Sequence, residues 1–308
     1  MEDNKKKNSS PKKKKTEVTG ALGFVETRGK TAAIGAMDIM PKTAEVAFTK
    51  RVNIGSGLVT VIYSGEVAAV ESAVSVAARL SEKIGTLVST NVIPRPHKRI
   101  YEILEQRSGE ESDTGISEEK KLALGMVETE GFTEMIAAAD EGIKAAHVVI
   151  PGWVTVGGGL TCVFFRGKVA AVHSAVEAGV IQAERKGKVS AAHVIASPHV
   201  GTEEVAPIGV FRGESVLRKT DWDAALGILE TQGIAALIEG IDAGLKAASV
   251  TVQGWEKIGR GITSTLFRGN VADVKSALDA ACAGAGKVGK VVGEYIIARP
   301  HSELEKGR

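Results

Sequence analysis

The stretch ALGFVETRGKTAAI, residues 21–34, occurs in this chain in three related copies. It returns as ALGMVETEGFTEMI at 123–136 and as ALGILETQGIAALI at 225–238. The step is 102 residues both times, and no insertion or deletion separates the copies. A repeat of this length is too long for a solenoid unit and has the size of a small domain with its own core. The sequence therefore predicts three tandem domains of one fold.

Composition changes between the copies mark the expected boundaries. Residues 105–120 are rich in Glu, Ser and Gly, and Pro207 and Gly209 interrupt the second connector, as is typical of linkers. Residues 1–17 hold seven Lys against three acidic residues and are predicted to be disordered. The predicted organisation is a Lys-rich tail at 1–17, domains at 18–104, 121–200 and 222–308, and linkers at 105–120 and 201–221.

The hydrophobic pattern within one copy alternates between strand and helix periods. In the first copy it predicts, in order, a strand at 22–27, a helix at 30–43, strands at 47–53 and 58–63, a helix at 67–83 and a strand at 88–93. A last helix is expected around Ile100 and Leu104, with weak support in the second copy and a truncated equivalent in the third. This order predicts an α+β fold, the split βαβ or ferredoxin-like antiparallel sheet with flanking helices.

Composition and charge limit the classes of function. The chain has 308 residues, of which 44% are hydrophobic and 25% charged, a balance typical of soluble globular proteins. The net charge is +2, and because the tail carries about +4, the body is slightly acidic, which argues against a generally basic nucleic-acid binder. No membrane span or secretory signal is expected. Cys162 and Cys282 form no C-x-x-C pattern and are expected to be thiols in a reducing cytosol.

A glycine turn follows the second predicted strand of each copy. The three turns are Gly55-Ser56-Gly57, Gly157-Gly158-Gly159 and Gly259-Arg260-Gly261. A phosphate-binding loop would need a helix after the glycines, but a β-branched strand follows here, which disfavours a nucleotide site. A plain hairpin turn remains possible. However, a turn that serves backbone shape alone would not need an arginine at its centre.

The remaining matched polar residues do not assemble a catalytic site. His97, His199 and His301 each follow a proline without a second ligand at metal spacing, so we expect strand-end or cap residues and no metal. The pairs Asp38–Lys42, Asp140–Lys144 and Asp242–Lys246 are four residues apart on a predicted helix and are expected to be surface ion pairs. No nucleophile with a base and an orienting group is visible, so we expect no enzyme activity and no cofactor.

Three motifs in constant order resemble the shell protein domain of bacterial microcompartments. They are ALGFVETRGKTAAI, then IGSGLVTVIYSGEVAAVESA at 54–73, then VIPRPH at 92–97, and all three copies carry the pattern in the unpermuted strand order. The resemblance implies flat cyclic hexamers that tile into the facets of a protein shell. It also implies that the glycine turns line a central pore through which small metabolites pass.

Carried over residue by residue, the resemblance assigns two sets of residues. The implied pore-lining residues are Gly55, Ser56, Gly57, Gly157, Gly158, Gly159, Gly259, Arg260 and Gly261. The implied tile-edge residues are Lys42, Lys144, Lys246, Arg95 and Arg299, together with His97, His199 and His301. The second copy departs from the pattern, because Ser197 stands at the arginine position. One edge in three is therefore expected to tile more weakly or to prefer a particular neighbour.

Domain number then sets the expected assembly. In the family that the chain resembles, single-domain members form hexamers and two-domain members form trimers, so three domains per chain imply a homodimer with pseudohexameric outline. Two Arg260 side chains in such a ring would favour anions over cations. The implied partners are a second copy, other shell proteins and small metabolites, without a membrane or a specific nucleic acid. The implied location is a microcompartment shell in the cytoplasm.

Two rival classes of function remain at this point. A regulatory oligomer built on a similar α+β domain would bind a small molecule between its domains, and would not form sheets or shells. A nucleic-acid role through the lysine tail would be independent of nucleotide sequence and strongly salt-dependent.

Overall fold

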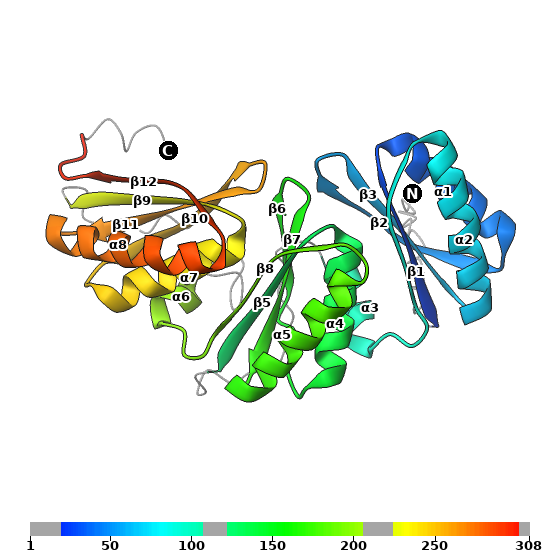
Figure 1. Ribbon diagram of the computed structural model, residues 1–308, viewed down its shortest axis with the longest axis horizontal. Helices are drawn as coiled ribbons and strands as arrows, with labels where there is room; N and C mark the ends of the chain where they lie inside the picture. The colour runs from blue at the N-terminus through cyan, green and yellow to red at the C-terminus, as the bar shows by residue number, and fades with distance from the viewer. Residues whose placement is uncertain (1–19, 107–121, 206–223, 302–308) are drawn as a thin grey trace, which may run out of the picture.

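The structure, a computed structural model, describes residues 20–106, 122–205 and 224–301 (Figure 1). The predicted tail, most of both predicted linkers and the last seven residues lie outside these ranges. Each range contains one four-stranded antiparallel sheet with helices beside it, and we call these the first, second and third units. The predicted α+β fold in three tandem copies is therefore confirmed.

The bounds of the elements are as follows. The first unit contains β1 (Ala21–Arg28), α1 (Lys30–Thr43), β2 (Val46–Gly55), β3 (Leu58–Gly65), α2 (Val67–Ile84), β4 (Thr86–Ile93) and α3 (Lys98–Glu105). The second contains β5 (Ala123–Glu130), α4 (Phe132–Ala145), β6 (Trp153–Gly157), β7 (Leu160–Gly167), α5 (Val169–Glu184), β8 (Lys188–Ile195) and α6 (Val200–Val205). The third contains β9 (Ala225–Gln232), α7 (Ile234–Ala247), β10 (Thr251–Gly259), β11 (Ile262–Gly269), α8 (Val271–Val288) and β12 (Lys290–Ile297).

The three sheets share one topology. Their strand orders are β2-β3-β1-β4, β6-β7-β5-β8 and β10-β11-β9-β12, and every pair is antiparallel. The predicted elements agree with these within one or two residues. The last helix is present as α3 and, despite the weak pattern of the second copy, also as α6.

A glycine in the opening strand explains how the long helix packs on each sheet. A Cβ atom on Gly23 would lie 2.6 Å from Val70 Cγ1, and one on Gly125 would lie 2.6 Å from Val172 Cγ1. Both valines belong to the long helix of the same unit. Only a residue without a side chain lets that helix approach the central strand so closely. The repeated Ala-Leu-Gly motif is therefore a packing requirement.

The opposite faces of the first and second sheets pack against the next unit. Phe24 and Ile62, on the face of the first sheet turned away from α1 and α2, join one buried cluster with Phe132 and Ile136 of α4. The second sheet and α7 form an equivalent cluster. The units therefore associate head to tail, with the sheet of one covered by the first helix of the next.

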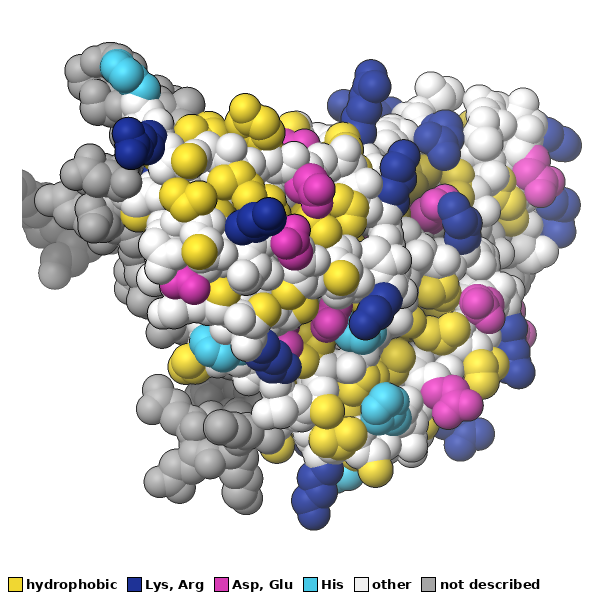
Figure 2. Space-filling model, turned by 60° about the vertical axis from the view of Figure 1, so that its left-hand side comes forward, with side chains coloured by type: hydrophobic (Ala, Val, Ile, Leu, Met, Phe, Trp, Pro, Cys, Tyr) yellow, Lys and Arg dark blue, Asp and Glu magenta, His cyan; other side chains and the backbone are white. Residues whose placement is uncertain are grey.

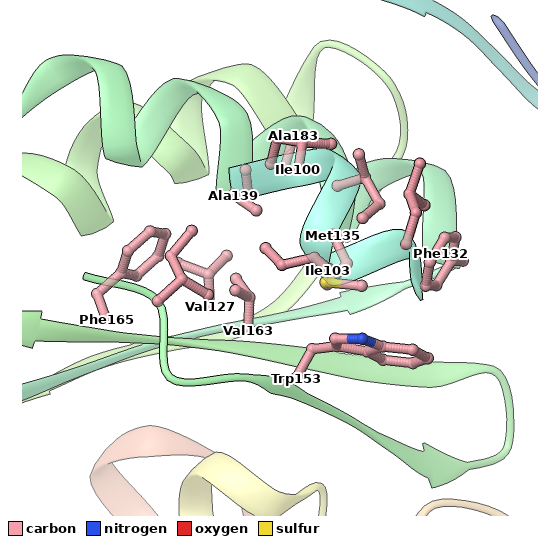
Figure 3. Close-up of a cluster of buried hydrophobic side chains, with 14 of the residues drawn as sticks. Ile100, Ile103, Val127, Phe132, Met135, Ala139, Trp153, Val163, Phe165 and Ala183 are labelled. Atoms are coloured by element: carbon pink, nitrogen blue, oxygen red, sulfur yellow. The ribbon is translucent and has the colours of Figure 1, made fainter. Parts of the chain in front are cut away.

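Helix α3 strengthens the first of these junctions. Figure 3 shows Ile100 and Ile103 of α3 pointing into the core of the second unit, beside Met135. In the same cluster the rings of Phe132 and Trp153 pack edge to face, with centroids 5.0 Å apart. Helix α3 thus belongs to the first repeat by sequence and to the core of the second unit by packing.

Among the helices that the structure describes, none combines the length and the apolar character needed to cross a bilayer.

Candidate functional site: the glycine turns and the unit junctions

The three glycine turns lie next to one another. The hairpins β2–β3, β6–β7 and β10–β11 extend toward the same region in Figure 1. A Cβ atom on Gly55 would be 3.7 Å from the backbone nitrogen of Gly158, and one on Gly157 would be 3.6 Å from that of Gly261. Turns that are about a hundred residues apart in sequence therefore meet, the first with the second and the second with the third.

The central residue of each turn has a left-handed backbone. The φ angles are 51° at Ser56, 66° at Gly158 and 54° at Arg260. Such a conformation suits the two-residue hairpin turn, but a residue with a side chain adopts it at a cost of about 1 kcal/mol. Ser56 and Arg260 are both exposed at this costly position. Their side chains are therefore not explained by the folding of the hairpin.

The third turn explains why the second turn has a glycine, Gly158, at its centre. A Cβ atom there would lie only 2.7 Å from the carbonyl carbon of Arg260 and 2.8 Å from the carbonyl oxygen. Because these are backbone atoms, they cannot move aside as the end of a side chain could. The close approach of the third turn thus excludes any side chain at the centre of the second.

Gly158→Ser is expected to lower the free energy of unfolding by about 1–3 kcal/mol, since the new Cβ would push the second and third turns apart. Thermal denaturation of the purified protein measures the change. Ser56→Gly is the matched control, because it removes a side chain from the same left-handed conformation at the equivalent position and should keep the melting temperature or raise it by a few degrees. Equal melting temperatures for Gly158→Ser and the unmodified protein would contradict the close approach.

A buried glutamate caps the next unit's helix at each junction. Glu26 Oε2 accepts hydrogen bonds from the backbone nitrogens of Phe132 and Thr133, at 3.0 and 3.1 Å. Glu128 Oε2 accepts from Ile234, at 2.7 Å, and from Ala235, at 3.4 Å. A carboxylate is stabilised there because the first N–H groups of a helix lack partners and carry the positive end of its dipole.

Sequence reasoning did not single out these glutamates. The available signal was a charged residue in the middle of an apolar strand, repeated in each copy as Glu26, Glu128 and Glu230. Glu26 and Glu128 are completely or almost completely buried, whereas Glu230 is partly exposed. The difference follows from position, because α4 and α7 cover the first and second sheets, whereas no described helix covers the same face of the third sheet.

A second acidic residue faces Glu26 at the first junction. Glu134 of α4 is 1% exposed, and burial together with the charge of Glu26 raises its pKa to about 7. Glu134 Oε2 and Glu26 Oε1 have no hydrogen-bond partner among the described residues. At the second junction, burial raises the pKa of Glu128 to about 7 as well.

The residues implied as tile edges gather where two units meet. Lys144 Nζ donates to the carbonyl oxygen of Arg95 at 2.7 Å and contacts Asp140 Oδ2 at 2.5 Å. Asp140 Oδ1 in turn accepts from the backbone nitrogen of His97 at 2.8 Å. The structure therefore brings these four residues, from the first and second units, into one cluster.

The second junction repeats this cluster in part. Asp242 accepts from the backbone nitrogen of His199 at 2.6 Å and pairs with Lys246 at 2.5 Å. The surface-pair interpretation is thus wrong for Asp140 and Asp242, whose side chains are 7% and 3% exposed. It holds for Asp38 and Lys42, whose side chains are 62% and 63% exposed, because no described unit packs against this end of α1.

The rings of His97 and His199 each accept a hydrogen bond from the backbone two residues further along. His97 Nδ1 accepts from the backbone nitrogen of Arg99 at 3.2 Å, and His199 Nδ1 accepts from that of Gly201 at 3.0 Å. His97 is therefore a cap of α3. Within the described ranges, no three His, Cys, Asp or Glu side chains are grouped closely enough to hold a metal ion.

The fold and these contacts define a class of protein: a tandem-repeat chain whose units associate head to tail and place their hairpin turns together. The family model described as BMC domain matches residues 21–96, 123–198 and 225–300. These three matches cover most of the chain, so the chain belongs to the BMC domain family and carries three BMC domains in tandem.

Curated relatives are proteins of microcompartments. The chain is 35% identical over 195 residues to the carboxysome assembly protein CcmO of Synechocystis sp., an alignment that covers 62% of this chain and 66% of that protein. It is 47% identical over 88 residues to the bacterial microcompartment shell protein PduA of Citrobacter freundii, covering 29% of this chain and 95% of that protein. The shell protein EutM of Escherichia coli is 46% identical over 93 residues, 30% of this chain and 95% of that protein.

Solved structures of microcompartment proteins are also similar. A microcompartment protein from Desulfitobacterium hafniense has 28% sequence identity and a TM-score of 0.47, and the match covers 61% of this chain and 99% of that one.

Proposed function

We propose that this chain is a structural shell protein of a bacterial microcompartment, and that two copies close into a flat pseudohexameric tile with a central pore. The proposal rests mainly on one observation. The same head-to-tail junction occurs twice within the chain, and no described residue covers the two complementary halves on α1 and on the third sheet. A head-to-tail contact that closes generates a ring, and six equivalent units would close this one.

The first uncovered half is the outer face of α1. Ile34 is 59% exposed, whereas the equivalent Ile136 of α4 and Ile238 of α7 are 0% and 1% exposed. Those two isoleucines are buried because each helix packs on the sheet of the preceding unit. The outer face of α1 thus carries an isoleucine at the junction position, but no described sheet packs against it.

The second uncovered half is the free face of the third sheet. Ile258 is 53% exposed, whereas the equivalent Ile54 and Val156 are 2% and 0% exposed. Tyr295 on β12 is 66% exposed, and the equivalent Asn91 is 3% exposed. Figure 2, which brings the third unit forward, shows hydrophobic side chains among scattered charges on that side of the molecule.

The polar contacts of a junction are also available at these two ends. Glu230 is partly exposed and has the position from which Glu26 and Glu128 cap the next helix. Asp38 is exposed and has the position from which Asp140 and Asp242 accept a backbone N–H of the preceding unit. In the proposed ring, Glu230 caps α1 of the partner.

The third glycine turn is open on the corresponding side. A Cβ atom on Gly55 or Gly157 would meet the next turn within 4 Å, but one on Gly259 would meet none of the described residues within that distance. In the ring, the first turn of the partner would occupy this place. The exposed central residues Ser56 and Arg260 would then surround an opening, each appearing twice, and Arg260 would favour anionic metabolites.

Arg260→Ser is expected to reduce the entry of inorganic phosphate into assembled shells several-fold, since it removes a positive charge from the proposed opening. Uptake by shells that contain the variant measures the effect. Arg260→Lys, which keeps the charge, should retain most of the uptake. Unchanged phosphate entry in Arg260→Ser shells would contradict the pore assignment. Failure of the protein to join shells or sheets with other shell proteins would contradict the proposed function itself.

A further inference from the structure

We propose that Arg28 is a second charge-determining residue of the pore and that it gives the first glycine turn a positive charge which its central residue lacks. The inference rests on the proposed function, because it needs the turns to surround an opening. It concerns the last residue of the opening strand of each unit: Arg28, Glu130 and Gln232. Sequence reasoning did not connect this position with the turns, which lie 28 residues further along.

The structure places Arg28 against the first turn. Its Nη1 donates a hydrogen bond of 3.0 Å to the carbonyl oxygen of Ser56, and its Cγ lies 3.8 Å from the position of a Cβ atom on Gly57. The side chain is exposed. The guanidinium is therefore held at the edge of the turn and still faces solvent, where a passing ion would meet its charge.

The equivalent residue of the third unit makes the same contact without a charge. Gln232 Nε2 donates to the carbonyl oxygen of Arg260 at 3.0 Å. An amide is thus sufficient to bind the carbonyl oxygen at the centre of a turn. The charge of Arg28 is not required for that hydrogen bond and needs another explanation.

The second unit adds no net charge at this position. Glu130 cannot donate to a carbonyl oxygen when ionised, and its carboxylate pairs with Lys188. The first turn therefore carries one positive charge from Arg28, the second none from this pair, and the third one from Arg260. A two-chain ring would then surround its opening with four guanidinium groups, twice the number that the central residues supply.

Four guanidinium groups around one opening fit a small anion as the permeating species. A carboxylate or a phosphate accepts hydrogen bonds from guanidinium groups, and its negative charge is attracted by all of them. A small cation such as an ammonium compound is repelled by the same groups. The selectivity would therefore depend on two positions in each chain, of which only one lies at the centre of a turn.

Arg28→Gln is the decisive variant, because Gln232 already demonstrates the hydrogen bond that glutamine makes at this position. The variant should keep the melting temperature and the assembly of the protein. Two unit charges roughly 8 Å from a singly charged ion are removed from an aqueous opening, so inorganic phosphate uptake by shells should fall by about fivefold and methylammonium uptake should rise by a similar factor. The ratio of phosphate uptake to methylammonium uptake should therefore fall by about 25-fold. Gln232→Arg, which adds a charge at the third turn, should raise the ratio.

The outcomes separate this inference from the proposed function. If Arg260→Ser lowers the ratio and Arg28→Gln does not, the pore exists and the role of Arg28 is overturned. If neither variant changes the ratio in shells that contain the protein, the pore assignment fails together with the inference. If Arg28→Gln lowers the melting temperature or prevents assembly, Arg28 is a structural residue of the turn and the inference is likewise overturned.

Discussion

Ile34→Asp is expected to separate the two chains of the proposed ring and to leave a particle of one chain of 32.1 kDa in solution. Ile34 is 59% exposed within one chain, so the substitution should not disturb folding. In the closed ring the same side chain would be buried against the third sheet of the partner, as Ile136 and Ile238 are buried at the internal junctions. An unpaired carboxylate at such a site costs several kcal/mol, enough to separate the chains at micromolar concentration. Light scattering and sedimentation velocity measure the mass.

Ile181→Asp is the matched control for this experiment. Ile181 on α5 is 49% exposed and lies outside both uncovered halves of the junction. The equivalent residues of the other units are Arg79 and Ala283, so this position tolerates polar and small side chains. The control variant should remain a two-chain particle. An Ile34→Asp protein that keeps the mass of two chains would disprove head-to-tail closure through α1.

Glu134→Gln is expected to stabilise the protein above neutral pH, by about 1–3 kcal/mol at pH 8. Burial and the charge of Glu26 raise the pKa of Glu134 to about 7, so ionisation at pH 8 places two carboxylates together inside the junction. A glutamine has nearly the same volume, carries no charge, and can donate to Glu26 Oε1, which has no partner among the described residues. Of the other groups near Glu134, Ser89 hydrogen-bonds its side chain and so lowers the pKa, in opposition to burial.

The sign of the pH dependence follows from linkage. The pKa values of Glu134 and Glu128 rise on folding from 4.5 to about 7, so the folded state binds more protons than the unfolded state between those values. Stability is therefore highest at the acidic end of this window and falls as pH rises through 7, by up to about 3 kcal/mol for each group. Glu134→Gln should remove the part of the pH dependence of stability that comes from Glu134 and leave the part that comes from Glu128.

Urea denaturation of both proteins at pH 5, 7 and 8 tests this expectation. Glu134→Ala, which introduces the residue that the first and third units have at this position, Ala32 and Ala236, should also flatten the slope. The glutamine variant should be the more stable of the two, because alanine leaves a cavity. A glutamine variant that is less stable than the unmodified protein at pH 8 would show that the ionised Glu134 is favourable in the junction.

The sequence alone predicted the order of elements in each unit because the signals are local. The alternation of apolar residues, the glycine turns and the prolines after the fourth strand occur within about 80 residues and are repeated three times. Helix α6 was the weakest of the predicted elements, since Val200–Val205 has little apolar periodicity of its own. It is present in the structure, packed beside α7 and β10 of the third unit.

The contacts between units could not be predicted in this way. Glu26 binds the backbone of Phe132, 106 residues away, and nothing local in either segment indicates the other. Gly158 is required by the backbone of Arg260 and not by its own hairpin. Both depend on the relative position of two folded units, which a periodicity within one repeat does not contain. The repeated motif predicted three units of one fold, but it did not indicate which residues of one unit contact the next.

The three different turns have a consequence for how such an opening can be varied. In a ring of six identical chains, any substitution appears six times, and a large or charged side chain would crowd the axis from every direction. Here Ser56, Gly158 and Arg260 are encoded separately. A single codon change would alter only two opposite positions of the proposed ring. Substitutions in the fused chain can therefore change the size and charge of the proposed opening at two positions at a time, whereas a substitution in a one-domain subunit changes all six positions.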